Sequence, residues 1–390
     1  MPVRAFGEIS TYRFRFLFFV IVAALWLPAL AHAAGYPLQI DADTYAALSF
    51  RVQAAAVLEQ DQAGAANGDA TKGGDHYDFF ARRIQLLATG QVTSALSFMM
   101  MLEHARYGQN HSRGTGMQTA DAWVQLNMSE AFHLMAGVYN PPFSRNQLTS
   151  VMYLIGPDRP ILENMMLESP GLYEKRDNGA CLWGNFSGLQ YRFAVGKGAK
   201  SPIMGDEALR TTWRVHYAFL DPEPIYYYKE SYLGKQRVFT VGYSYDKQER
   251  VTLDASGNPA PYTASTYDLL MEGGGDGSTY SILYAYYSYD WGNPERTGAD
   301  GLFVQGNGWT LTAAYLSSPS QPYVRYTTWD AASVSPGAKQ KRTAIGTNYF
   351  MKGHESKFTF EYETISFDLE GSTYDMKNHG VFTIQFQAAF

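Results

Sequence analysis

Cysteine is almost absent from this sequence, since Cys181 is the single one among 390 residues. One thiol excludes an intramolecular disulfide framework, a cysteine-based metal site and the attachment of a c-type haem. We interpret Cys181 as a buried or loop thiol without a chemical role. Charged residues are also scarce, at 17%, and the formal net charge is −6. This acidic balance argues against nucleic acid as a partner.

Long apolar runs are equally rare. The run from Phe16 to Leu30 follows three arginines and precedes Ala31-His32-Ala33, which is the layout of a secretory signal peptide and its cleavage site. We therefore expect residues 1–33 to be removed near Ala33 and residues 34–390 to form the exported domain, with an uncleaved anchor as the alternative. The mature chain then has 28 basic and 36 acidic residues, a net charge near −8. Because the mean hydropathy is −0.26, no second membrane-spanning helix is expected.

Aromatic residues are abundant, at 15%, with 29 Tyr and 23 Phe. They suit a protein that needs amphipathic rings at two membrane interfaces. The last residues of the chain alternate strictly, and one row is the more apolar: Phe382, Ile384, Phe386, Ala388 and Phe390. A terminal strand of this kind, ending on Phe, is typical of the closing strand of a bacterial outer-membrane barrel. We expect Phe386 and Phe390 to form the signal read by the barrel-insertion machinery; an ordinary sandwich strand is the alternative.

Alternation between apolar and polar residues recurs along the chain. It predicts strands near residues 46–58, 80–88, 92–102, 120–128, 132–138, 189–195, 211–219, 239–245, 263–271, 279–289, 301–306, 309–317, 322–329, 340–351, 356–366 and 379–390. The connections alternate between long and short, as the loops and turns of such barrels do. The sequence therefore predicts an all-β fold, a transmembrane antiparallel β-barrel of about sixteen strands with a water-filled lumen.

The third loop is predicted to run from about residue 139 to 183, far beyond the usual length of a structureless connection. It contains Pro141-Pro142, several apolar residues and mixed charges, so we expect it to pack against something. The available place in a wide barrel is the lumen, where the loop would narrow the pore; an external cap is the alternative. The loop supplies four constriction candidates: Arg145, Asp158, Arg159 and Glu163.

Two stretches of the sequence resemble the phosphate-selective porin O and P family of Gram-negative outer membranes. The first is Gly-Val-Tyr-Asn-Pro-Pro-Phe-Ser at 137–144, followed by Leu148-Thr149-Ser150 and Asp158-Arg159-Pro160. It is similar to the family's segment that leads from a strand into the constricting third loop. The second is Gly-Thr-Asn-Tyr-Phe-Met-Lys-Gly-His-Glu-Ser-Lys-Phe at 346–358, similar to a strand, turn and strand near the family's C-terminus. Arg82-Arg83 and the turn at Gly90 are a weaker third likeness.

The resemblance implies a sixteen-stranded trimeric channel with inward-folded loops, in the outer membrane of a Gram-negative bacterium. Phosphate-selective members of the family carry basic side chains along the lumen, and no such ladder can be matched here residue by residue. The third loop has nearly balanced charge. We therefore expect a general or weakly selective porin, with phosphate among the candidate anions.

Selectivity in a pore comes from charged rings and from the narrowest diameter. Face parity places nine charged residues inside the barrel: Arg51, Arg83, Glu103, Asp121, Arg192, Arg214, Lys357, Glu361 and Glu363. Arg325 is a further pore-lining candidate, although the parity of its strand is ambiguous. Each could equally be a solvated or paired lumen charge, which is the commoner case. Arg82 falls on the apolar face of its strand, which indicates a subunit contact, the membrane interface or a shifted register.

Other functions receive less support from the sequence. The histidines show no metal-ligand spacing, no serine-histidine-acid arrangement can be assembled, and no cofactor is expected. An outer-membrane hydrolase remains an alternative, as does a barrel that serves as a sleeve around an electron carrier in a multi-protein conduit. The partners expected are outer-membrane lipid, two further copies of the chain in a homotrimer, and the insertion machinery.

Overall fold

The computed structural model describes residues 36–41, 43–60, 75–114, 116–202, 207–254, 256–275, 277–292, 305–331, 339–368 and 378–390. The predicted signal peptide, residues 1–33, lies outside them. No helix in this part of the chain is both long and apolar enough to cross a bilayer.

Strands account for most of the described chain. Before the third loop they are β1 (Tyr36–Gln39), β2 (Tyr45–Glu59), β3 (His76–Thr93), β4 (Leu96–Tyr107), β5 (Gln118–Ser129) and β6 (Phe132–Tyr139), with the 3-10 helix η1 (Gln109–His111) between β4 and β5. The third loop holds the short helices α2 (Arg145–Leu148), η2 (Val151–Tyr153) and η3 (Ile161–Met165). After it come β7 (Asp177–Phe186), β8 (Leu189–Gly196), β9 (Arg210–Ala218), β10 (Val238–Leu253), β11 (Pro259–Gly275), β12 (Ser278–Asp290), β13 (Gly306–Ser317), β14 (Ser320–Ala331), β15 (Lys339–Lys352), β16 (Ser356–Asp368) and β17 (His379–Ala389).

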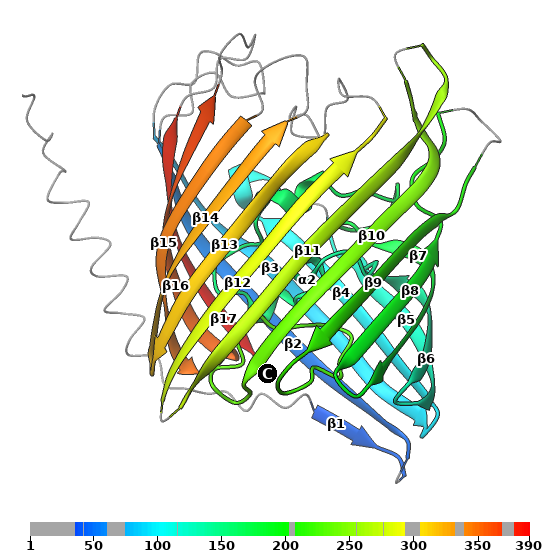
Figure 1. Ribbon diagram of the computed structural model, residues 1–390. Helices are drawn as coiled ribbons and strands as arrows, with labels where there is room; N and C mark the ends of the chain where they lie inside the picture. The colour runs from blue at the N-terminus through cyan, green and yellow to red at the C-terminus, as the bar shows by residue number, and fades with distance from the viewer. Residues whose placement is uncertain are drawn as a thin grey trace, which may run out of the picture. The chain divides into compact units, whose positions relative to one another are not determined.

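Strands β2 to β17 form a closed ring (Figure 1). Each pairs antiparallel with its neighbour in sequence, and β17 pairs back with β2 from Val381↔Glu59 to Ala389↔Arg51. The predicted all-β barrel of sixteen strands is therefore confirmed for the described residues. Closure matters because every backbone amide facing hydrocarbon must find its hydrogen-bond partner within the sheet. The short strand β1 pairs with Tyr45–Leu48 of β2, just beyond the end of β17.

The two faces of the strands differ in character as alternation predicts. Large apolar side chains on the outer face are exposed, among them Leu48 at 63%, Phe79 at 68% and Ile345 at 62%. Inward side chains include charged ones that are almost fully buried, such as Asp121 and Arg214 at 1% each. An apolar exterior suits the hydrocarbon of a bilayer, whereas burial of inward charges shows that something fills much of the lumen.

Connections of two or three residues gather at one end of the barrel, as at 94–95, 130–131, 187–188 and 353–355. We call this end the turn side, and the other end the long-loop side. The connection between β9 and β10 breaks the rule, because residues 219–237 lie at the turn side and yet are long. We call residues 219–237 the turn-side segment.

The predicted strand count is correct, but two of the predicted segments are not. Strand β7 (Asp177–Phe186) was expected to be the end of the third loop, which in the structure covers residues 140–176. Its central inward residues Cys181 and Trp183 are apolar and buried, so the polar row that marks the other strands is interrupted there. Of the predicted strand at 301–306, residues 301–304 lie outside the described part of the chain, and Gly306 opens β13.

Candidate functional site

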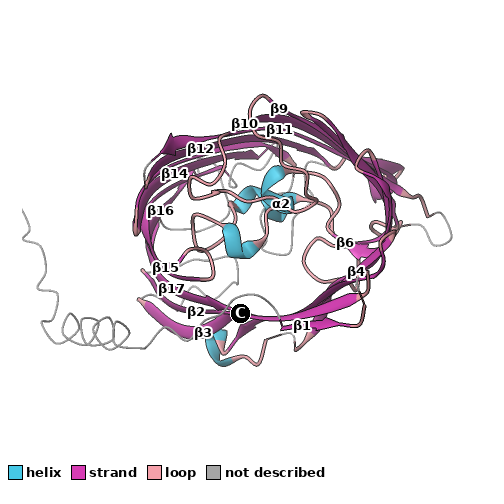
Figure 2. Ribbon diagram, turned by 90° about the horizontal axis from the view of Figure 1, so that it is seen from below, coloured by secondary structure: helices cyan, strands magenta, loops and turns pink. Residues whose placement is uncertain are grey.

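The third loop, residues 140–176, which we call L3, lies inside the ring of strands. Figure 2, viewed from below, shows α2 and its neighbouring loops within the barrel. Pro141 and Pro142 follow β6 and cannot donate to a sheet ladder, so the chain leaves the wall at this point. Ser144 then caps α2, because its hydroxyl accepts a hydrogen bond from the Gln147 amide at 2.8 Å. This cap turns the chain across the lumen.

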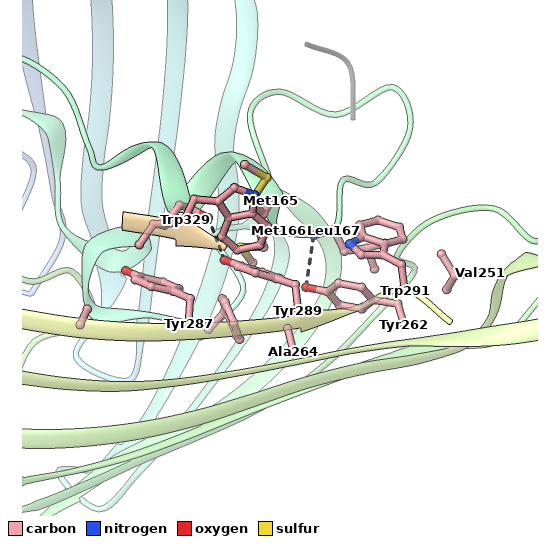
Figure 3. Packing of buried hydrophobic residues seen from close by; sticks show 13 residues of the cluster. Met165, Met166, Leu167, Val251, Tyr262, Ala264, Tyr287, Tyr289, Trp291 and Trp329 are labelled. Atoms are coloured by element: carbon pink, nitrogen blue, oxygen red, sulfur yellow. Dashed lines mark hydrogen bonds between the residues drawn. The ribbon is translucent and has the colours of Figure 1, made fainter. Parts of the chain in front are cut away.

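An aromatic cluster holds the second half of L3 against the inner wall of β11, β12 and β14 (Figure 3). The Tyr289 hydroxyl donates to the Leu162 carbonyl at 3.0 Å, and the Tyr262 hydroxyl accepts from the Leu167 amide at 3.3 Å. The cluster consists of Phe143, Leu162, Met165, Met166, Leu167, Val251, Tyr262, Ala264, Tyr287, Tyr289, Trp291, Trp329 and Ala285, all buried. Apolar burial of this extent stabilises a fixed loop conformation.

Polar side chains of the wall fasten the first half of L3. Four consecutive strands around the seam each donate one hydrogen bond to an L3 carbonyl: Gln53 to Val151 at 3.3 Å, Gln387 to Met152 at 3.0 Å, Lys357 to Leu154 at 2.5 Å and Asn348 to Ile155 at 2.9 Å. Buried carbonyls need such partners because they have lost their contact with water. L3 is therefore bound to opposite walls and spans the lumen.

Asp158 of L3 is clamped by two consecutive arginines of β3. Arg82 donates to both of its carboxylate oxygens, at 2.9 and 2.7 Å, and Arg83 donates at 2.7 Å. Both arginines face inward because β3 carries a bulge: Gln53 pairs with Arg83 and Ala54 with Ala81, so Arg82 is skipped. A bulge re-aims a side chain in this way. Of the three explanations given for the position of Arg82, the structure therefore shows the shifted register.

The turn-side segment enters the lumen from the opposite end and meets L3. Arg145 of L3 forms a buried ion pair with Glu223 at 2.5 Å, and the Tyr228 amide donates to the Leu148 carbonyl at 2.9 Å. The Ile155 amide in turn donates to the Glu230 carboxylate at 2.6 Å. Burial raises the pKa of Glu230. The two segments together form one packed body inside the barrel.

The structure brings several predicted site residues together. Arg83 lies 3.5 Å from Glu103, and Arg325 forms a two-pronged contact with Glu361 at 3.0 and 3.1 Å. Asp121 accepts from Arg176 at 3.3 Å. Arg51 is half-buried on the inner face of β2. A role of these residues in lining the pore stays a prediction.

Other predicted residues lie apart from open solvent. The guanidinium carbons of Arg192 and Arg214 lie 4.5 and 5.5 Å from the centre of the Tyr228 ring, which belongs to the turn-side segment. Arg145, expected at the constriction, is 2% exposed and paired with Glu223. None of these three lines the cavity described below, because the turn-side segment covers them.

Glu163 and the C-terminal phenylalanines have definite surroundings. Glu163 accepts from Ser144 at 2.7 Å and from Tyr287 at 2.5 Å, and burial raises its pKa. Phe386 contacts Phe358 with ring centroids 4.9 Å apart. Phe390 is 56% exposed, and its ring lies 5.4 Å from that of Phe50.

Between L3 and the walls formed by β2–β4 and β14–β17 lies a cavity of about 1210 Å³ at the long-loop side. Eight basic and six acidic side chains line it, a balance of +2. Most of the arginines are paired with carboxylates, as Arg342 is with Glu363 at 3.1 Å. Arg159 instead donates to the carbonyls of Asn146 and Thr149, and no carboxylate of the described residues lies within 4.0 Å of it. Burial and the nearby charges of Arg83 and Arg176 lower the pKa of Arg159.

Sequence reasoning missed several residues of this lumen. The position of Arg82 stayed open among three explanations, because alternation cannot reveal a bulge. Arg176 was included in L3 only as a charge to be counted, although it binds Asp121. Glu223 and Tyr228 gave no signal, because Pro222 and Pro224 around Glu223 are typical of any turn. No cluster of three metal-binding side chains occurs in the described residues.

Known proteins are similar to this chain in both sequence and fold. Residues 56–196 match the family model of the phosphate-selective porins O and P. No curated protein matches the sequence significantly. OmpF of Salmonella typhi, solved in complex with daunomycin, is 11% identical, with 91% of this chain and 100% of that chain covered and a TM-score of 0.61.

Two further solved structures give the same result. An anion-selective porin from Comamonas acidovorans is 13% identical over 89% of this chain and 100% of its own, with a TM-score of 0.60. The outer-membrane channel DcaP of Acinetobacter baumannii is 13% identical, with 92% of this chain and 100% of that chain covered and a TM-score of 0.56. At such identities the likeness shows the fold alone. The resemblance to the phosphate-selective porin O and P family is nevertheless confirmed, since residues 56–196 match that family's model and the described chain has the fold of the outer-membrane porins.

Proposed function

We propose that this protein is a channel of the Gram-negative outer membrane through which small hydrophilic solutes and ions diffuse passively. The cavity of about 1210 Å³ between L3 and the barrel wall carries the proposal. Its lining is charged and polar, as an aqueous route requires, and it opens at the long-loop side, which faces the cell exterior in barrels of this kind.

We further propose that the channel is only weakly selective and prefers anions. The excess of two basic side chains around the cavity favours anions, whereas the pairing of Arg82, Arg325 and Arg342 with carboxylates cancels most of their field. Selectivity in a pore depends on charges that remain uncompensated. Arg159 is the best such charge, because carbonyl oxygens hold it. Phosphate is one anion that the route would admit.

The remaining expectations belong to the same proposal. Residues 1–33 would direct export and be removed near Ala33, the barrel-insertion machinery would read the terminal strand, and three copies would assemble into a homotrimer, as the family resemblance implies. The sleeve alternative fits less well, because two segments of the chain already occupy the lumen.

Single-channel recording in planar bilayers tests the proposal. The purified protein should give stepwise conductance, and its reversal potential in a salt gradient should show a small preference for anions. Arg159→Gln should reduce that preference, whereas the control Lys247→Gln, whose side chain lies on the outer face of β10, should leave it unchanged. A protein that inserts fully and never conducts would contradict the channel function. A preference that does not respond to Arg159→Gln would contradict its assigned role.

A further inference from the structure

L3 and the turn-side segment cover the inner wall of the barrel on one side and leave part of it uncovered on the other. From β9 to β14 the inward side chains lie beneath L3 and the turn-side segment: Ser244, Thr266 and Ser281 are 0% exposed, and Thr310 is 4% exposed. From β2 to β4 the inward residues nearest the turns are only half-buried: Ser49, Arg51, Ser97 and Met99. The turn side of the lumen is therefore partly accessible to solvent along β2–β4.

The cavity at the long-loop side borders the same wall. Arg83, Ala105 and Tyr173 line its floor. Below this floor, two successive inward pairs of β3 and β4 are buried: Gln85 with Glu103, at 2% each, and Leu87 with Met101, at 5% and 6% exposed. The cavity and the half-buried residues of the turn side thus lie along one wall, and a layer of buried side chains two residue pairs deep separates them.

One residue of L3 completes that layer. Tyr173 covers the inner-wall cluster of Leu87, Met101, Ala105 and Ala120, and its hydroxyl donates to Glu103 at 2.7 Å. Its exposed fraction is 6%. Removal of this ring would uncover Glu103 and this cluster on the side that faces the lumen.

The backbone around Tyr173 differs from the rest of L3. Glu174 and Lys175 both have positive φ, at 30° and 60°, a conformation that costs non-glycine residues energy and is held only by surrounding contacts. The side chains of Leu172, Glu174 and Lys175 are partly exposed, whereas residues 141–149 of L3 are all buried. The stretch 169–176 is the least enclosed part of L3.

We propose that solutes cross the barrel between residues 169–176 of L3 and the inner wall of β2–β4. Tyr173 is the gate of this route, and its hydrogen bond to Glu103 holds the gate in place. This inference rests on the proposed channel function and specifies its route. Arg51 is the charge that a solute meets after the gate, because it lies inward on β2 among the half-buried residues. The wall from β9 to β13 takes no part in permeation.

Thiol modification locates the route. Ser97→Cys on β4 and Ser281→Cys on β12 are matched substitutions on the two walls, and the wild type serves as the background because Cys181 is 0% exposed. A small charged methanethiosulfonate reagent should lower the current through Ser97→Cys and leave Ser281→Cys and the wild type unchanged. The route would be overturned if the reagent lowered the current through Ser281→Cys. It would also be overturned if Ser97→Cys conducted and its current did not respond to the reagent. A wild type that never conducts would instead count against the channel function itself.

Two substitutions test the gate. Tyr173→Ala removes the ring and should raise single-channel conductance by about 1.5-fold or more, because conductance follows the narrowest aperture. Tyr173→Phe keeps the ring and loses only the hydrogen bond to Glu103, so it should give more frequent transitions between conductance levels at nearly unchanged maximal conductance. Tyr232→Phe is the control, since the Tyr232 hydroxyl donates a hydrogen bond to Glu223 within the turn-side segment, away from the proposed route. Wild-type conductance in a folded Tyr173→Ala variant would overturn the gate.

Discussion

Arginine side chains tie separate parts of the chain together inside this barrel. Arg82 and Arg145 each reach from one segment to a carboxylate of another, and the planar guanidinium fork suits such two-pronged contacts. The pair of Arg145 and Glu223 is the more deeply buried of the two, with side chains 2% and 0% exposed. Removal of one partner from a pair buried in this way typically costs about 3–5 kcal/mol, because the other charge is left without compensation.

The face of the strand on which a side chain lies could be predicted from the sequence wherever the strand is regular. Arg83, Arg192 and Lys357 lie inward as parity requires, because successive side chains of a strand alternate between its faces. Arg82 shows the limit, since one extra residue in β3 reverses the parity before it. What an inward residue contacts could not be predicted at all, because its partner comes from a distant segment whose path alternation does not encode.

The half-buried histidine of the turn between β15 and β16 predicts a pH dependence of stability. Burial, together with the charge of Lys357, lowers the pKa of His354 to about 3, and its Nε2 lies 2.9 Å from the Ser231 carbonyl. Since the unfolded pKa is near 6.5, the unfolded state binds the extra proton between pH 6.5 and 3. Stability should therefore fall as the pH falls through this window, by about 1.4 kcal/mol for each unit of pKa difference.

His354→Gln isolates this contribution from that of Glu230, whose raised pKa acts in the opposite direction. The unfolding temperature in detergent should drop less between pH 7 and pH 4 for the variant than for the wild type. Equal drops in the two proteins would contradict a neutral His354.

At the scale of elements, two segments that enter from opposite ends share the lumen. L3 could be predicted from its length and from Pro141-Pro142, and its partner could not. The turn-side segment lies between strands predicted at 211–219 and 239–245, and nothing in its composition distinguishes an inward path from an exposed one. Strand β7 escaped prediction because its inward residues pack on Tyr226 as apolar side chains, so hydrophobic periodicity is weak there.

The packing of β7 against the turn between β5 and β6 predicts a strict requirement for glycine. A Cβ on Gly184 would lie 1.9 Å from the Ala131 carbonyl oxygen, which is backbone and cannot move aside. Gly184→Ala should therefore destabilise the barrel by about 1–3 kcal/mol, the usual cost of overpacking. Urea unfolding measures the loss, together with the fraction of heat-modifiable folded protein on a gel.

Gly275→Ala is the matched control, because a Cβ there meets nothing within 4 Å. It should unfold at the wild-type urea concentration. Equal stability of the two variants would mean that the turn at Ala131 adapts, contrary to the close approach seen here.

For the whole molecule, closure of the ring depends on the end of the chain. Phe390 and Phe50 exchange two backbone hydrogen bonds, at 2.9 and 3.0 Å, and their rings are in contact. Deletion of Phe390 removes these bonds, worth about 1 kcal/mol each, and shortens the terminal strand. The amount of folded protein in the outer membrane should fall severalfold, as measured by surface labelling, whereas Phe390→Tyr should assemble normally. Normal surface yield of the truncated chain would contradict this role.

The hydrogen bonds from Gln53 and Gln387 to L3 affect how the pore could be engineered. These glutamines sit on β2 and β17, the strands that meet where the ring closes, and they also bond each other at 2.8 Å. L3 therefore acts as an internal brace across the one joint between the first and last strands of the ring. A designer who shortens the loop to obtain a wider passage would also remove its hydrogen bonds to that joint. Greater permeability would therefore come with a less stable closure of the barrel wall.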